Sequence, residues 1–278
     1  MFLDARPRVG ATRAAAWAAA TLAAVALAVP AYLVTRPSRA DTWDGAEIFG
    51  LTLFFAATIP TLAFVFRSAS GDLPPLPVIG ALAVLQNAVF AGGALYIVRM
   101  KYRLPLAALG LTVGRWSRTL VQGAAAGAAA IAGNNLGQAA TVFVLGLWMG
   151  HRAADAVVQR DELRTPVFRV LTLVHQPLEL AAIVVLVGVI VPIGEELFFR
   201  GLVFGALRRR LNRHLAAFLS ALFFTAAHLE PAAALSILML GLVLAYTYEY
   251  TGSLLPGMTA HGVNNLMALF AFYQNPPG

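Results

Sequence analysis

The sequence has 278 residues, of which 59% are hydrophobic and only 12% charged, and its mean hydropathy is +0.75. A soluble domain carries about a quarter charged residues, so the composition excludes an ordinary soluble protein and indicates a multi-span membrane protein. The net charge of +7 does not indicate nucleic-acid binding, because the basic residues stand at the ends of apolar runs, where topology and anionic lipid explain them. The absence of cysteine removes disulfides, thiolate metal ligands and a cysteine nucleophile.

Apolar runs predict about eight membrane-spanning helices, since about 20 residues are needed to cross the bilayer core. The run from Thr119 to Gly150, for example, contains no Asp, Glu, Lys or Arg. The predicted spans lie near residues 14–35, 48–66, 75–98, 120–149, 178–207, 214–229, 231–249 and 254–273. The first run is too long for a signal peptide and no clean cleavage site follows it, so we expect an uncleaved span. The predicted fold class is an all-α polytopic membrane protein.

Three segments between or within these spans carry further expectations. The span at 120–149 contains Asn134 and Asn135, so it is predicted to be tilted, bent or partly re-entrant. Segment 100–118 is basic at both ends and apolar in the middle, which indicates an interfacial helix or an ordered loop on the membrane. Segment 151–166 is the long polar connection and is expected to be exposed to solvent.

Two basic clusters predict the orientation of the chain in the membrane. Two spans separate them, so both fall on one side, and the positive-inside rule makes that side cytoplasmic. Eight spans would then place both termini outside, although the N-terminal segment also carries Arg6, Arg8 and Arg13. The first cluster is Arg99, Lys101, Arg103, Arg115 and Arg118, and the second is Arg208, Arg209, Arg210 and Arg213.

Residues 194–201, GEELFFRG, place three ionisable groups in an apolar setting, and charges at membrane depth are functional candidates by default. Glu196 and Arg200 are four apart and share a helix face, so they are predicted to pair. Glu195 has no such partner in its own helix and is expected to face another element. Pro192, one turn earlier, is expected to kink the helix and free backbone carbonyls. The alternative is that these charges form an interfacial salt-bridge cluster at the end of a span.

The next two polar positions in the apolar C-terminal region each contain a histidine. His228 ends an apolar helix, with Phe224 one turn before it, and His261 and Asn265 are four apart on one helical face. Taken singly, each has a structural explanation, as a helix cap or as an interhelical hydrogen-bond pair. Together, a carboxylate, two imidazoles and an amide can activate a water and stabilise an oxyanion, which is the inventory for amide hydrolysis.

These residues form three motifs in order: E-E-x-x-x-R from Glu195 to Arg200, F-x-x-x-H from Phe224 to His228, and H-x-x-x-N from His261 to Asn265. With the linking run of residues 241–261, they resemble the intramembrane endopeptidases of the CAAX prenyl protease and bacteriocin-processing family (Abi or CPBP). The resemblance covers roughly residues 178–273. It implies an eight-helix-type bundle with a conical intramembrane catalytic cavity open to the cytoplasm.

The resemblance also implies roles for individual residues. Glu195 and His228 would activate the attacking water, His261 and Asn265 would stabilise the oxyanion, and Glu196, Arg200 and Phe224 would support the site. We expect no metal; the alternative is a zinc ion held by Glu195, His228 and His261, with water in the fourth position.

The function that follows is hydrolysis of a peptide bond in a membrane-associated or lipidated, CAAX-type protein by a multi-pass protein of a bacterial cell membrane. Membrane lipid and a peptide or lipidated protein substrate are the expected partners, and no nucleic acid is expected. Residues 1–160 would hold N-terminal helices and the interfacial segment, and 161–278 the catalytic core. Alternatives are a non-catalytic membrane peptide binder, such as a bacteriocin self-immunity protein, and a transporter, against which the lack of inverted repeats argues.

Overall fold

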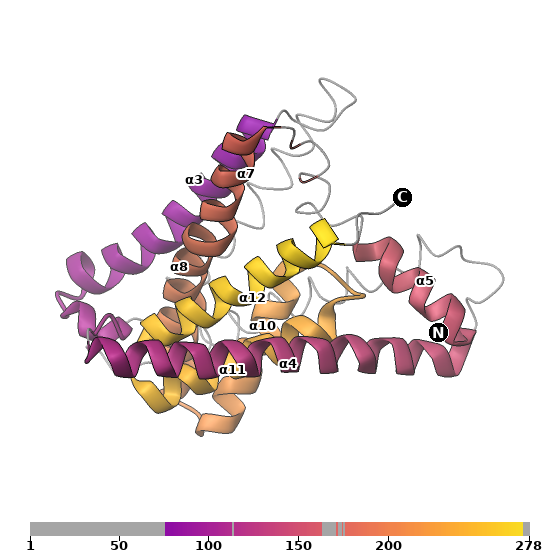
Figure 1. Cartoon of the computed structure of the whole chain (residues 1–278). Helices are drawn as coiled ribbons and strands as arrows, with labels where there is room; N and C mark the ends of the chain where they lie inside the picture. Colours follow the sequence, from indigo (N-terminus) through magenta and orange to yellow (C-terminus); the bar gives the residue numbers. More distant parts are fainter. Residues whose placement is uncertain (1–75, 113, 163–170, 172–173, 175, 275–278) are drawn as a thin grey trace.

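The computed structural model describes residues 76–112, 114–162, 171, 174 and 176–274, and every regular element among them is a helix (Figure 1). The all-α prediction is therefore confirmed for this part of the chain, whereas the predicted spans at 14–35 and 48–66 lie outside it. The α-helices are α3 (Leu76–Leu95), α4 (Trp116–Met149), α5 (His151–Glu162), α7 (Pro177–Val185), α8 (Val191–Glu195), α9 (Gly205–Arg208), α10 (Arg213–His228), α11 (Ala234–Thr251) and α12 (Leu254–Gln274). The π-helices are η1 (Tyr96–Lys101), η3 (Leu186–Ile190) and η4 (Glu196–Phe204), and η2 (Leu106–Leu109) is a 3₁₀-helix.

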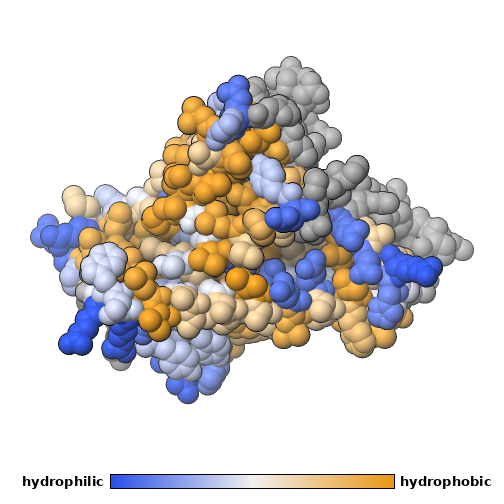
Figure 2. Space-filling view, in the orientation of Figure 1, coloured by the Kyte–Doolittle hydropathy of each residue, from blue (hydrophilic) through white to orange (hydrophobic). Residues whose placement is uncertain are grey.

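Four helical runs are long and apolar enough to cross a membrane: Leu76–Lys101, Trp116–Met149, Pro177–Arg208 and Ala234–Thr251. The chain is therefore an integral membrane protein. Helix α10 has 16 residues, or about 24 Å, which is shorter than the roughly 30 Å hydrocarbon core. Because α10 and α12 are not among the four runs, the count of about eight spans stays a prediction. In Figure 2 apolar side chains cover much of the visible helices, and hydrophilic ones lie at the left and lower edges and in the right-hand half of the view.

Helix α4 runs without interruption for 34 residues, so the predicted re-entrant form is wrong and Asn134 and Asn135 lie within a continuous helix. It packs along α11 and α12 (Figure 1). The crossing with α11 is close because Gly137 carries no side chain: a Cβ there would lie 2.5 Å from the backbone of Ser236. The Ser236 hydroxyl donates to the Asn134 carbonyl at 3.0 Å. Small residues of this kind let membrane helices approach closely.

In segment 100–118 the described residues between η1 and α4 form a loop with the 3₁₀ turn η2, not a long interfacial helix, and its place on the membrane stays a prediction. Leu109 is fully buried, and the Gly110 carbonyl accepts a hydrogen bond from the Leu254 amide at 2.9 Å. This loop therefore lies at the end of α11. Arg208 pairs with Glu249 near the same end of α11. Both basic clusters thus lie at one end of the helices, which we call the basic end.

Segment 151–166, expected as an exposed connection, instead begins with the twelve-residue helix α5. Ala154 and Val158 are four apart and buried, while most of the remaining residues of α5 are exposed. This face packs against α4, so α5 is an amphipathic helix. The predicted division of the chain at residue 160 stays a prediction, although α4 packs against two helices on the other side of that boundary.

An aromatic cluster joins the helices around the candidate site. Phe90 of α3 stacks on Phe198 of η4 with 4.5 Å between ring centroids, and Phe199 meets Phe223 and Phe224 of α10 edge to face at 5.5 and 5.0 Å. All five rings are at most 5% exposed. Aromatic pairs in such geometry add about 0.5–1.5 kcal/mol each beyond the burial of their area. The segment that carries the two glutamates is therefore held firmly on both sides.

Candidate active site

The site is built on a helical run whose hydrogen-bond register changes around Pro192. In η3 the Val191 amide bonds to the carbonyl of Leu186, five residues back, as in a π-helix. In that register the Val187 carbonyl would pair with the amide of residue 192, which is proline and has no N–H. The Val187 carbonyl is thereby freed, as the sequence predicts for a carbonyl near Pro192, and it accepts a hydrogen bond from Asn265 Nδ2 at 3.1 Å.

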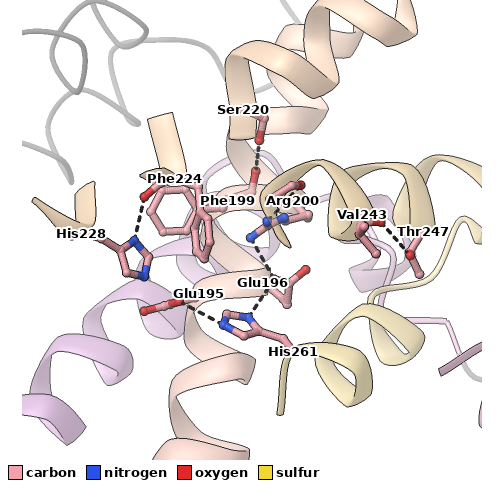
Figure 3. Close-up of polar contacts among 11 residues, drawn as sticks. Glu195, Glu196, Phe199, Arg200, Ser220, Phe224, His228, Val243, Thr247 and His261 are labelled. Atoms are coloured by element: carbon pink, nitrogen blue, oxygen red, sulfur yellow. Dashed lines mark hydrogen bonds and ion pairs between the residues drawn. The ribbon is translucent and has the colours of Figure 1, made fainter. Parts of the chain in front are cut away.

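Glu196 and Arg200 form the predicted pair, fully buried, with Arg200 Nη1 2.9 Å from Glu196 Oε1 (Figure 3). Arg200 Nη2 also donates to the Gly241 carbonyl at 3.3 Å. The guanidinium lies over the ring of Phe224, with Cζ 4.4 Å from the ring centroid, a cation–π geometry. Through these contacts the Arg200 guanidinium connects η4, α10 and α11.

Glu195 points away from this pair, as its spacing predicts, and faces α12. Its Oε2 lies 3.7 Å from His261 Nε2, and the carboxylate is 12% exposed. This distance exceeds that of a hydrogen bond, and Oε2 is buried without a hydrogen-bond partner among the described residues. A buried carboxylate oxygen left unpaired costs free energy, so Glu195 holds an acceptor that is available to a ligand.

His261 lies between the two glutamates (Figure 3). Its Nδ1 is 3.2 Å from Glu196 Oε1, and its ring meets Phe224 edge to face at 5.7 Å. Helix α12 reaches this position because it crosses η3 closely: a Cβ added to Gly262 would lie 2.2 Å from the Gly188 carbonyl oxygen. The position of His261 therefore depends on the close contact between Gly262 and Gly188.

His228 ends α10, and Leu229 follows in the left-handed conformation with φ 54°. The residue after that is followed by Pro231, which is typical of a helix stop. His228 Nδ1 lies 2.8 Å from the Phe224 carbonyl, and because a carbonyl only accepts, Nδ1 carries the hydrogen. In the neutral ring Nε2 is then the acceptor. His228 thus ends its helix, as expected, and also keeps Nε2 as a hydrogen-bond acceptor.

One cavity of about 360 Å³ collects the residues of all three motifs. Glu195, His228, His261 and Asn265 all line it, so the structure brings together the four residues predicted to be catalytic. Glu196, Arg200 and Phe224 are not among the lining residues. Glu196 and Phe224 contact His261, and Arg200 contacts Glu196 and Phe224. Further lining residues come from α4, α5, η3, α8, α11 and the turn between α10 and α11, and they include Asn134, Gln138, Val158, Val187, Glu230 and Leu240. The conical shape remains a prediction.

The metal-free site and the alternative zinc set of Glu195, His228 and His261 both stay predictions. Among the described residues, no three histidine, aspartate, glutamate or cysteine side chains are grouped closely enough to hold a metal ion. His261 directs Nδ1 at the carboxylate of Glu196 and Nε2 toward Glu195, an arrangement that a metal-ligating histidine also adopts.

Several contributors could not be found from side-chain motifs. Gly257 lies against the unpaired oxygen Glu196 Oε2, which would be 3.1 Å from an added Cβ. The backbone carbonyls of Val187 and Gly241 accept hydrogen bonds from Asn265 and Arg200. The sequence indicates only the first of these acceptors, through Pro192. Gln138 lies in a region where the sequence singled out only the neighbouring Asn134 and Asn135.

Comparison with known proteins identifies the family of the C-terminal region. Residues 177–267, which contain all three motifs, match the family model described as "Type II CAAX prenyl endopeptidase Rce1-like". No curated protein and no solved structure matches the chain. The matched segment covers about a third of the 278 residues and includes most lining residues of the cavity. Residues 177–267 are thus a domain of the Rce1-like CAAX endopeptidase family, a family of membrane proteases.

Proposed function

We propose that the protein is an intramembrane endopeptidase that hydrolyses a peptide bond of a membrane-associated or lipidated protein through a water activated by Glu195 and His228. One observation carries the proposal: residues from three separate motifs line a single cavity, and one of them, Glu195, has a buried carboxylate oxygen without a hydrogen-bond partner among the described residues. The family supports protease activity in a membrane. The catalytic type and the CAAX-type substrate belong to the proposal.

In the proposed reaction the attacking water sits between Glu195 and His228. The His228 ring accepts a hydrogen bond at Nε2, because Nδ1–H is committed to the Phe224 carbonyl. Glu195 takes a proton as the water oxygen bonds to the substrate carbonyl carbon. A positioned base of this kind contributes about 10²- to 10⁴-fold to a rate.

The developing oxyanion would receive hydrogen bonds from His261 and Asn265. Asn265 uses one amide hydrogen on the Val187 carbonyl, and its second hydrogen remains for the substrate. His261 donates from Nδ1 to Glu196 and, when the ring is doubly protonated, from Nε2 to the oxyanion.

Collapse of the tetrahedral intermediate breaks the C–N bond. The proton held by Glu195 passes to the departing amine nitrogen, and the carbonyl re-forms as the carboxyl group of the new C-terminus. Glu195 is then again ionised, so the cycle needs no other reactant than water. Glu196 and Arg200 stay paired throughout and keep His261 in place.

We propose that the basic end faces the cytoplasm, since its two clusters contain nine Lys and Arg residues and segment 151–176 contains four. The cavity lies toward the other end of α10, α11 and α12, because its lining residues His228, Ser236 and Leu269 stand near the ends of these helices that are remote from the basic end. The two arguments therefore disagree on the side of the cavity. The resemblance implies that it opens to the cytoplasm, whereas the positive-inside rule places it toward the opposite side of the membrane.

Labelling of a cysteine in α5, beside the cavity, separates these two orientations. Because the chain has no cysteine, a Gln159→Cys variant offers one thiol, and residue 159 is exposed. We expect a membrane-impermeant maleimide to label it from outside in intact spheroplasts. Labelling only in inverted vesicles would instead support a cavity open to the cytoplasm.

The function is tested with purified protein in nanodiscs and a panel of fluorogenic peptides, prenylated and unmodified. Glu195→Gln should lower cleavage by at least about 10²-fold, whereas Glu249→Gln, which changes a carboxylate that pairs with Arg208 at the basic end, should not. Activity should survive a metal chelator, and loss on chelation would return the site to zinc. Peptide binding without cleavage by the wild type would favour the non-catalytic binder.

A further inference from the structure

A second cavity, of about 500 Å³, lies between α4 and α5 and borders the first. The two cavities share Gln138 and Val158 as lining residues. We call the second one the α4–α5 groove. Its walls combine polar side chains, among them Asp155 and Gln159, with the apolar Val142 and Phe143. The catalytic cavity therefore adjoins a groove whose described lining residues all lie outside the family segment, residues 177–267.

We propose that the α4–α5 groove binds an extended segment of the substrate peptide on one side of the bond to be cleaved, and that Gln138 hydrogen bonds to its main chain. This inference rests on the proposed function. Gln138 is exposed at the junction of the two cavities. An amide side chain both donates and accepts, and each residue of an extended peptide presents one donor and one acceptor.

The dimensions suit a short extended segment. Along α4, lining residues run from Asn134 in the catalytic cavity to Phe143 in the groove, nine steps or about 13.5 Å at 1.5 Å per residue. At about 3.3 Å per residue of extended chain this length holds about four residues. The apolar wall can contact substrate side chains while the amides pair with the main chain, the combination that is typical of ligand sites.

The charges of the lining indicate which part of a substrate fits. Asp155, Glu195 and Glu230 line the two cavities, and no lysine or arginine is among the described lining residues. A free C-terminal carboxylate would meet these like charges without a lysine or arginine to pair with, and only the histidines of the lining could offset the repulsion, which is unfavourable. The groove is therefore suited to an internal peptide segment, neutral or cationic, rather than to a chain end with a free carboxylate.

The kinetic test compares Gln138→Leu with the wild type and with a matched control, Gln122→Leu. Gln122 is on the same helix, 16 residues or about 24 Å away, and lines neither cavity. The substrates are a cleaved peptide and two versions trimmed by four residues at one end or the other. Loss of one uncharged hydrogen bond should lower kcat/KM of Gln138→Leu on the full peptide about 3- to 10-fold, mainly through KM.

The trimmed peptides show whether the effect comes from the groove. One of them should be cleaved equally by wild type and Gln138→Leu, because it no longer reaches the groove. An equal loss on all three peptides, or a loss as large in Gln122→Leu, would overturn the proposal, since it would reflect folding. Failure of the wild type to cleave any peptide would count against the proposed function instead.

A second readout does not depend on turnover. A Val142→Cys variant in the Glu195→Gln background carries one thiol in the groove, and Leu136→Cys carries one on the exposed surface of α4 as a control. A peptide with a bromoacetyl group placed about four residues from the scissile bond should crosslink to Cys at position 142 and be competed by unlabelled peptide. Equal or absent crosslinking at the two positions would refute the groove as the binding site.

Discussion

Replacing Arg200 by methionine would remove the positive charge that holds the centre of the site together. The fully buried guanidinium bonds to Glu196 at 2.9 Å and to the Gly241 carbonyl at 3.3 Å, and it covers the ring of Phe224. Methionine keeps much of the volume and the helix propensity. The change therefore isolates the charge and its hydrogen bonds.

The expected loss is large because Glu196 would remain buried with only His261 as a partner. Removing one member of a buried ion pair costs about 3–5 kcal/mol, since the other charge is left uncompensated. The chain contains its own control, because Arg208 and Glu249 form a pair of the same 2.9 Å length with side chains 39% and 17% exposed. Arg208→Met should cost only about 0–1 kcal/mol.

Unfolding in nanodiscs, followed by intrinsic tryptophan fluorescence, measures the two losses side by side. A Glu196→Gln/Arg200→Met double variant should recover part of the stability, because the unpaired carboxylate is gone, and a double-mutant cycle gives the coupling. Equal losses for Arg200→Met and Arg208→Met would refute the reasoning, since burial is what distinguishes the two pairs.

Three further predictions concern the neighbourhood of Asn265. Asn265→Leu should lower kcat about 10²- to 10³-fold with a smaller change in KM, as expected for loss of one oxyanion donor, and an equal rise in KM would assign it to substrate binding. Pro192→Ala should raise the unfolding temperature, because a proline is removed from a helix interior. It should also lower kcat, because the new N–H competes for the Val187 carbonyl that orients Asn265. A rise in both the unfolding temperature and kcat would contradict this role. Gly262→Ala should destabilise the protein by more than 1 kcal/mol through the clash with η3, whereas Gly80→Ala, with nothing within 4 Å, should be neutral or stabilising in thermal unfolding.

The sequence by itself was informative wherever the decisive contact is local. The pairing of Glu196 with Arg200 follows from positions four apart on one helix, and the structure confirms it at 2.9 Å. The freed carbonyl near Pro192 follows from the missing N–H of proline, which also acts within one turn. The start of the last helix is local as well: the span predicted from residue 254 begins at Leu254, directly after Ser253, whose hydroxyl accepts from the Leu255 amide.

What only the tertiary structure decided are the contacts between helices far apart in the chain. Spacing shows that Glu195 faces away from Arg200, but not that His261, 66 residues later, lies between the two glutamates, because that depends on how closely α12 crosses η3. The same holds for Gln138, whose place between two cavities depends on the packing of α4 against α5 and α11. Helical periodicity fixes the direction of a side chain from its own axis, whereas the packing of whole helices fixes what it meets.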